Sequence, residues 1–258
     1  MNKIKALKRY GQNFLIDNQV INKIVNLVEP QSPNQVIEIG PGDGALTRGL
    51  INNFEKYSGI EIDPRLIEKL EIEFPGISLI KKDIIKVNLE ELILPENYTY
   101  IFGNIPYNIS TPIMYKLIKN FNLIDKAVIM VQLETAQRVT SPFGTKNYNA
   151  SNVIFNFFAD IKIHFEVPRN AFIPRPHVDS AVMSLTFKKN KTDAHIFEVF
   201  SDIVKTAFLT RRKVLKNSTL NKKYGFFNFE NLDKFMMKRA DELTPEDYFT
   251  ITQTISGK

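Results

Sequence analysis

The first two thirds of the chain alternate short apolar, β-branched runs with helical patterns. Five runs predict strands, at residues 35–39, 57–62, 77–82, 98–104 and 126–133. A strand and helix alternation of this kind is typical of a parallel sheet that is covered by helices. We therefore expect an α/β fold.

Helical patterns at about residues 45–54, 64–74 and 111–120 lie between these runs. Two of them carry a proline, Pro64 and Pro112, in a first turn, where the N–H that proline lacks has no helical partner to lose. These helices are expected to connect consecutive strands of the sheet.

The pattern changes in the last quarter of the chain. The runs at 161–167 and 180–187 still extend the sheet, and we expect an antiparallel pair because only a proline-rich loop divides them. Beyond about 189–194 the sequence predicts helices with no strand between them. We therefore predict two domains, an α/β domain at 1–190 and a small all-helical domain at 191–258.

Composition narrows the class of protein. With 258 residues, 43% of them hydrophobic and 24% charged, the chain can bury a large core and is not disordered. No stretch approaches the roughly 20 apolar residues that cross a bilayer, and no apolar leader follows the start, so we expect a cytoplasmic protein without a membrane partner. The absence of cysteine and three scattered histidines, His164, His177 and His195, predict no metal site.

The net charge of +6 indicates a polyanionic partner, and its distribution is the stronger evidence. The segment 205–223 contains no acidic residue and seven basic ones: Lys205, Arg211, Arg212, Lys213, Lys216, Lys222 and Lys223. The beginning of the chain, "KIKALKRYGQNF", is also basic. Either run alone is as typical of a solvated face as of a nucleic-acid contact.

The first predicted strand runs into the glycine loop "EIGPGDGALT". Gly40, Gly42 and Gly44 let the backbone turn tightly and bring its N–H groups close to a ligand. The spacing is ambiguous, because with Ala45 it also satisfies the dinucleotide pattern G-x-G-x-x-[GA]. Glu61 ends the second strand, where a carboxylate can accept from the hydroxyls of a ribose. The loop and the acid together predict a nucleotide-like ligand.

Asp83 closes the third predicted strand, within "KKDI". A carboxylate at this edge of the sheet can accept from the amino group of an adenine. The alternative is a helix N-cap or a turn, and the sequence favours neither.

The fourth strand ends in "GNIPYNIS", which favours methyl transfer to an amine over hydride transfer. The lone pair of an exocyclic adenine amine is delocalised, so two acceptors must uncouple it: the Asn104 side chain and a main-chain carbonyl near Ile105 or Pro106. Pro106 fixes φ and adds no donor, and Tyr107 can stack on an extruded base. The alternative is an ordinary turn whose tyrosine covers the core.

With these motifs the sequence resembles the ribosomal RNA adenine N6,N6-dimethyltransferase family, and is most similar to its bacterial small-subunit branch. The matching segments cover nearly the whole chain, in order: "GQNFL", "EIGPGDGALT", "GIEIDPRL", "KKDI", "GNIPYNIST", "MVQLETAQR", "GTKNYNASNV", "FIPRPHVDSAV", "AFLTRRKVLKN" and "RADELTPEDYFTI". This sequence departs from the usual family pattern at Leu133 and around 147–153. These differences affect the local RNA contacts that the resemblance implies.

The resemblance implies the Rossmann-like class I fold of S-adenosylmethionine-dependent methyltransferases, with a mostly parallel seven-stranded sheet and a small helical C-terminal domain. It also implies the residues that contact the cofactor S-adenosylmethionine: Asn13, Leu15, Gly40, Gly42, Glu61 for the ribose, Asp83 for the adenine, and Asn104.

For the substrate, the resemblance implies that Phe172 sandwiches the target base against Tyr107, although without the family Phe172 is more typical of ordinary core. It implies that Arg211, Arg212 and Lys213 meet RNA phosphates. The expected partner is small-subunit rRNA in an immature 30S subunit, bound by a monomer.

Three functions remain open on this sequence. The first is dimethylation of two adjacent adenines in the 3′-terminal hairpin loop of 16S rRNA, with a role in small-subunit biogenesis. The second is methylation of one large-subunit adenine, against which "RADELTPEDYF" counts. The third is a binding protein that kept the fold and lost catalysis, against which the intact Asn104 and Tyr107 count.

Overall fold

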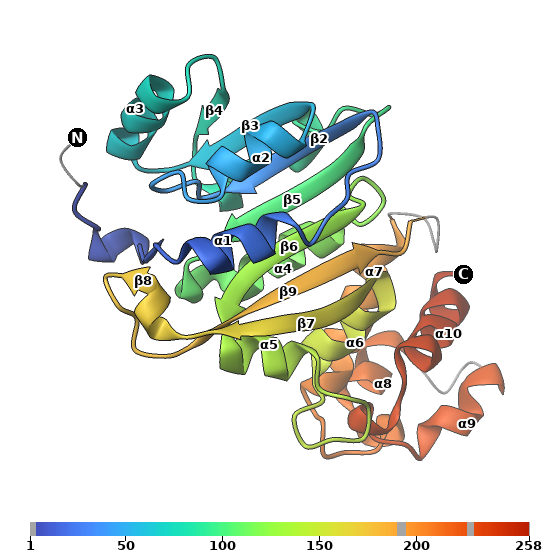
Figure 1. Cartoon of the computed structure of the whole chain (residues 1–258). Coiled ribbons are helices and arrows are strands. Elements are labelled where there is room, and N and C mark those ends of the chain that lie inside the picture. The colour runs from blue at the N-terminus through green and yellow to red at the C-terminus, as the bar shows by residue number, and fades with distance from the viewer. Residues whose placement is uncertain (1–3, 190–194, 226–229, 258) are drawn as a thin grey trace. The chain divides into compact units, whose positions relative to one another are not determined.

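A computed structural model describes residues 4–189, 195–225 and 230–257 of the chain. A seven-stranded sheet runs in the order β4-β3-β2-β5-β6-β9-β7 (Figure 1). Its strands are β2 (Asn34–Ile39), β3 (Lys56–Glu61), β4 (Ser78–Lys81), β5 (Tyr98–Asn104), β6 (Lys126–Gln132), β7 (Ala159–Val167) and β9 (Ser180–Phe187). The first five of these pair in parallel, and β9 runs antiparallel to β6. The predicted mostly parallel seven-stranded sheet is confirmed.

Four helices pack around the sheet, and two of them begin at an aspartate cap. They are α1 (Asn18–Val25), α2 (Thr47–Asn53), α3 (Pro64–Glu73) and α4 (Ser110–Lys119). The side chain of Asp17 accepts from two N–H groups of α1, and that of Asp63 caps α3, whose first residue is Pro64. In Figure 1 α1 and α2 lie in front of the sheet. Both contribute to one apolar cluster with Val36, Phe102 and Val182 of the sheet.

Three features near the sheet are absent from the sequence-based expectation. Helix α1 is one, and α5 (Leu133–Val139) after β6 is another. The third is a small second sheet, in which β1 (Phe14–Leu15) pairs antiparallel with β8 (Phe172–Ile173). Two-residue strands carry too short a pattern to be recognised, and they join segments that are far apart in the sequence.

The chain divides into two compact units. The first consists of Met1–Ala136 and Ile161–Lys189, and the second of Gln137–Asp160 and Asn190–Lys258. The segment 137–160, which the sequence placed in the α/β domain, is therefore grouped with the helical one.

Aromatic packing explains the composition of the second unit. Its helices are α6 (Ala150–Phe158), α7 (Ile196–Phe208), α8 (Thr219–Tyr224), α9 (Asp233–Met236) and α10 (Pro245–Ser256). The ring of Phe157 stacks on Phe200 with centroids 4.5 Å apart, and Phe158 lies 5.4 Å from Phe197. These rings are buried, so α6 belongs to the core of the helical unit. The described part of 195–258 is helical, as predicted, with an isolated bridge between Val214 and Arg239.

Candidate active site

A cavity of about 230 Å³ lies at the carboxyl edge of the parallel strands. Because β2, β3, β4 and β5 run in the same direction, the residues that follow them meet at this edge. The cavity lining includes nine of the residues predicted for the site: Asn13, Leu15, Gly40, Gly42, Glu61, Asp83, Asn104, Pro106 and Tyr107. The structure thus brings together residues from five separate segments of the chain.

The glycine loop after β2 closes one side of the cavity. Gly40 and Gly42 have φ values of +67° and +59°, a conformation that L side chains rarely adopt. The Gly40 N–H donates to the Ile60 carbonyl (2.9 Å), which ties the loop to β3. A Cβ on Gly40 would meet no atom within 4 Å, so the missing side chain leaves open space beside the backbone.

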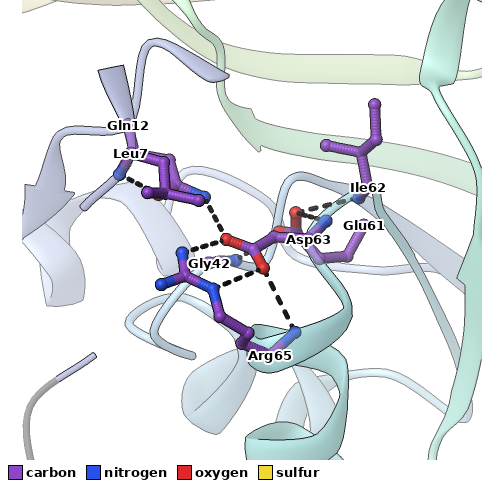
Figure 2. Close-up of polar contacts among 7 residues, drawn as sticks. All are labelled: Leu7, Gln12, Gly42, Glu61, Ile62, Asp63 and Arg65. Atoms are coloured by element: carbon purple, nitrogen blue, oxygen red, sulfur yellow. Dashed lines mark hydrogen bonds and ion pairs between the residues drawn. The ribbon is translucent and has the colours of Figure 1, made fainter. Parts of the chain in front are cut away.

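Glu61, at the end of β3, is held in place by three backbone donors (Figure 2). Its Oε1 accepts from the N–H groups of Ile62 and Asp63, both at 2.9 Å, and its Oε2 accepts from Gly42 at 3.0 Å. Burial raises the pKa of this carboxyl, and the three donors oppose that effect. A carboxylate offers about four acceptor positions. The one that remains is therefore on Oε2, beside the glycine loop.

Asn104, the last residue of β5, is joined to the N-terminal segment. Its Nδ2 donates to the Asn13 carbonyl at 2.9 Å. This bond uses one of the two Nδ2 donors and orients the amide, and the acceptor Oδ1 has no partner among the hydrogen bonds of the described residues, so it can accept from a ligand. This contact links two segments that lie 91 residues apart in the sequence.

The turn after Asn104 is equally well defined. The Pro106 carbonyl accepts from the Ile109 N–H at 3.1 Å and from the Ser110 hydroxyl at 3.3 Å. The Tyr107 hydroxyl forms a hydrogen bond of 2.7 Å with the hydroxyl of Ser180, which fixes the half-buried ring at the cavity wall. Burial also raises the pKa of Tyr107, so the phenol stays neutral at physiological pH.

The structure shows Asp83 as an N-cap, and the same residue also lies at the cavity. Its Oδ1 accepts from the Ile85 N–H at 3.0 Å and caps the short helix Ile84–Lys86, as expected of an N-cap. The same residue lines the cavity. Since Oδ1 is engaged in the cap, a ligand on this side would meet Oδ2.

Phe172 is not placed as the resemblance implied. Only 2% of the residue is exposed, and it packs in the apolar cluster with Leu15 instead of lining the cavity. The pairing of β8 with β1 explains this placement, because side chains alternate along a strand. Phe172 points inward, and its neighbour Ile173 is 47% exposed. In this structure the ring is core and does not line the cavity, so the structure gives no support to the predicted stacking on a base.

The three basic residues predicted to meet RNA lie in the helical unit, just after α7, and differ in their surroundings. Arg211 donates through Nε to Asp241 Oδ2 at 3.0 Å and through Nη2 to the Lys146 carbonyl at 3.1 Å. It is therefore occupied in holding this unit together. Arg212 and Lys213 are exposed.

Sequence reasoning missed Glu38, a cavity-lining carboxyl near the end of β2 that is 1% exposed. Its Oε2 accepts from the hydroxyls of Thr47 and Tyr57, both at 2.7 Å. Burial raises its pKa to about 7, the two hydroxyls oppose this, and the charge of Glu61 adds to it. A charged residue inside the apolar run "QVIEI" was the available signal.

This carboxyl gives stability a pH dependence with a definite sign. Between pH 4.5 and about 7 the folded chain keeps the Glu38 proton that the unfolded chain has released, so the free energy of unfolding falls as pH rises through this range. Glu38→Gln has no proton to lose at this position, so its free energy of unfolding should not show this fall. We expect its advantage over the wild type to be about 3 kcal/mol larger at pH 8 than at pH 4.5, measured by urea unfolding. Glu71→Gln, at an exposed site on α3, is the control, and an equal advantage at both pH values would contradict the prediction.

Other site classes are not represented in the described residues. Residues 4–189, 195–225 and 230–257 contain no cluster of His, Cys, Asp and Glu that could hold a metal ion. Within the same ranges, no helix is long and apolar enough to cross a membrane.

Comparison with known proteins identifies relatives over the whole length. The family described as Ribosomal RNA adenine dimethylase matches residues 3–256. Ribosomal RNA small subunit methyltransferase A of Mycoplasmopsis pulmonis is 39% identical over 257 residues, which cover 96% of this chain and 98% of that protein. The protein of the same name from Clostridioides difficile is 34% identical, covering 98% of this chain and 92% of its own.

Two solved structures share the fold at 26% identity. A dimethyladenosine transferase from Plasmodium falciparum superposes with a TM-score of 0.76, covering 92% of this chain and 95% of that one. The 23S rRNA methyltransferase ErmE gives a TM-score of 0.71, with 95% and 100% coverage. The resemblance seen in the sequence is thereby confirmed, and the chain belongs to the ribosomal RNA adenine dimethylase family.

Proposed function

We propose that this chain transfers methyl groups from S-adenosylmethionine to the exocyclic N6 of two adjacent adenines in the 3′-terminal hairpin loop of small-subunit rRNA. The observation that carries the chemistry is the position of Asn104. Its amide lines the same cavity as the glycine loop and Glu61, and one of its two N–H donors is bound to the Asn13 carbonyl, which orients the side chain.

The cavity fits the cofactor that the family uses. Open space adjoins Gly40, the free acceptor position of Glu61 suits one ribose hydroxyl, and Asp83 presents a second acceptor farther along the same edge. Asn13 and Leu15 line the cavity from the N-terminal segment. When bound, S-adenosylmethionine supplies an electrophilic methyl group.

Two acceptors prepare the target amine. An adenine amine is a poor nucleophile because its lone pair is delocalised into the ring, and hydrogen bonds from both of its N–H groups favour a pyramidal nitrogen. Asn104 Oδ1 is the first acceptor. The Pro106 carbonyl already accepts two hydrogen bonds, so we assign the second role to the carbonyl of Ile105.

Tyr107 holds the base. Its hydroxyl is fixed to Ser180, and its ring stands at the cavity wall, where a base extruded from the RNA can stack. The neutral amide of Asn104 stabilises the developing positive charge on the amine without trapping it. The surplus proton is acidic enough to leave to water, and no residue is required as a base.

The relatives favour a small-subunit substrate over a large-subunit one. Proteins named Ribosomal RNA small subunit methyltransferase A are 34–39% identical to this chain, whereas ErmE, named for 23S rRNA, is 26% identical. We therefore propose immature 30S subunits as the partner, a monomeric enzyme and the cytoplasm as its place of action. A role in assembly would accompany catalysis.

Modified-base mapping tests the substrate. Purified protein is incubated with S-adenosylmethionine and with unmethylated 30S or 50S particles, and primer extension locates dimethylated adenines on both rRNAs. Stops at two adjacent adenines near the 3′ end of 16S rRNA are expected. A stop on 23S rRNA alone would transfer the function to the large subunit, and stops on neither would indicate a binding protein.

The helical unit is proposed to contribute phosphate contacts through Arg212 and Lys213. Replacing both by alanine should weaken RNA binding. The plot of log K against log salt has a negative slope, and its magnitude should decrease by about 1 to 2, since each phosphate contact releases counterions. Filter binding at KCl concentrations from about 50 to 300 mM measures the slope. Lys56→Ala, at the start of β3, is the control, and an unchanged slope in the double variant would remove this contact from the proposal.

A further inference from the structure

The N-terminal segment forms a wall of the cofactor cavity although it belongs to no strand of the large sheet. The contiguous residues Arg9, Tyr10, Gly11, Gln12, Asn13 and Phe14 all line the cavity. A wall made of one short segment can retain a ligand only if its position is fixed. Two side-chain contacts fix it, and the Asn13–Asn104 hydrogen bond described above is one of them.

The second contact joins Gln12 to Asp63 on the ribose side of the cavity (Figure 2). Gln12 Nε2 donates to Asp63 Oδ2 at 3.0 Å. The other end of the same amide is also used, because Oε1 accepts from the Leu7 N–H at 2.8 Å. Gln12 therefore closes the turn that begins at residue 7 and ties that turn to a residue 51 positions away.

Asp63 is itself held by several hydrogen bonds, and it is bonded to Glu61, the carboxylate proposed to bind the ribose. Its Oδ1 accepts from the backbone N–H of Arg65 at 3.1 Å and from its Nε at 3.0 Å, and its Oδ2 accepts from Nη2 at 2.6 Å. The hydrogen bonds from Arg65 hold the pKa of Asp63 down to about 2, so the carboxylate stays charged. The N–H of Asp63 donates to Glu61 Oε1.

We propose that Asp63 is a positioning residue that latches the N-terminal segment through Gln12 and thereby tightens the binding of S-adenosylmethionine. The inference rests on the cofactor use stated above. The cap of α3 and the pair with Arg65 require Asp63 but not Gln12. The bond to Gln12 is therefore separable from the fold of α3, and its effect falls on the cavity wall.

Two substitutions at Gln12 test the latch and leave the bonds between Asp63 and Arg65 in place. Gln12→Glu sets two carboxylates against each other. Gln12→Met, which has a similar length and no donor, breaks the contact without adding charge. Gln19→Glu, at an exposed position of α1, is the matched control for the added charge.

Three measurements are made on each full-length variant: the Kd of S-adenosylmethionine by titration calorimetry, amide hydrogen exchange of residues 7–13 without cofactor, and kcat at saturating cofactor. Hydrogen bonds to charged groups are strong. We therefore expect Gln12→Glu to raise Kd by about 10- to 100-fold, to speed exchange, and to change kcat less than Kd. Gln12→Met should act in the same direction, with a smaller rise in Kd because it adds no charge.

Each contrary outcome overturns the latch. Faster exchange with unchanged Kd in Gln12→Met would show that the segment does not retain the cofactor. Weak binding by Gln12→Glu together with normal binding by Gln12→Met would show that the added charge, and not the loss of the 12–63 contact, is the cause. If the wild type itself binds no S-adenosylmethionine, the proposed function fails first, and calorimetry of the wild type alone reveals this.

Discussion

Replacing Asn104 by alanine should lower methyl transfer by about 10²- to 10³-fold, the usual cost of removing one preorganised hydrogen bond to a developing charge. The side chain supplies the acceptor that uncouples the target amine. Its hydrogen bond to the Asn13 carbonyl is also lost, so the Kd of the cofactor should rise by less than about tenfold. Single-turnover transfer of labelled methyl groups into unmethylated 30S particles measures the rate.

The comparison variant is Asn53→Ala, an exposed asparagine at the end of α2 that should leave transfer unchanged. Calorimetry on Asn104→Ala separates the two roles of the side chain. A near wild-type rate would refute the catalytic role of Asn104. A rate that recovers fully when cofactor is raised would reduce the residue to a support for the N-terminal segment.

Replacing Phe157 by alanine should destabilise the helical unit by about 3–5 kcal/mol, the typical cost of emptying the site of a buried phenylalanine. The residue is fully buried, and its ring contacts Phe158, Phe200 and Phe249 at centroid distances of 4.9, 4.5 and 4.8 Å. Urea unfolding followed by hydrogen exchange of 195–225 measures the loss.

Phe143→Ala provides the matched control, because that ring lies in the same unit and is 49% exposed. It should cost under about 1 kcal/mol. If Phe157→Ala lowered protection only in the sheet and not in α7, residues 137–160 would belong energetically to the α/β unit. The boundary predicted at residue 190 would then describe stability better than the grouping seen in the structure.

The sheet could be predicted from the sequence because its signals are local. The strands at 98–104 and 180–187 begin and end at the predicted residues, and the strand predicted at 57–62 is shifted by one residue, to Lys56–Glu61. The glycine loop follows β2, and Glu61 and Asn104 are the last residues of β3 and β5, so parallel topology alone brings them to one edge. Local pattern and topology agree for these residues.

The missed features depend on contacts between distant segments. Phe172 carries no local signal that separates core from base stacking, and its pairing partner Leu15 is in another part of the chain. The contact between Gln12 and Asp63 also has no local signal, because a glutamine in a loop and an aspartate before a helix are each typical of ordinary local structure. The apolar run at 150–158 predicts burial but does not say against which helices.

The helical unit is assembled from two stretches that the ribosome delivers at different times. Residues 137–160 emerge while the remaining helices, after residue 194, have not been made, so the phenylalanines of α6 must wait for α7 and α10. A nascent chain in this condition presents an unsatisfied apolar face, the kind of surface that chaperones recognise. The core of this unit can therefore form only after α10 has been synthesised, and chains stalled before that point should be the species most prone to aggregate.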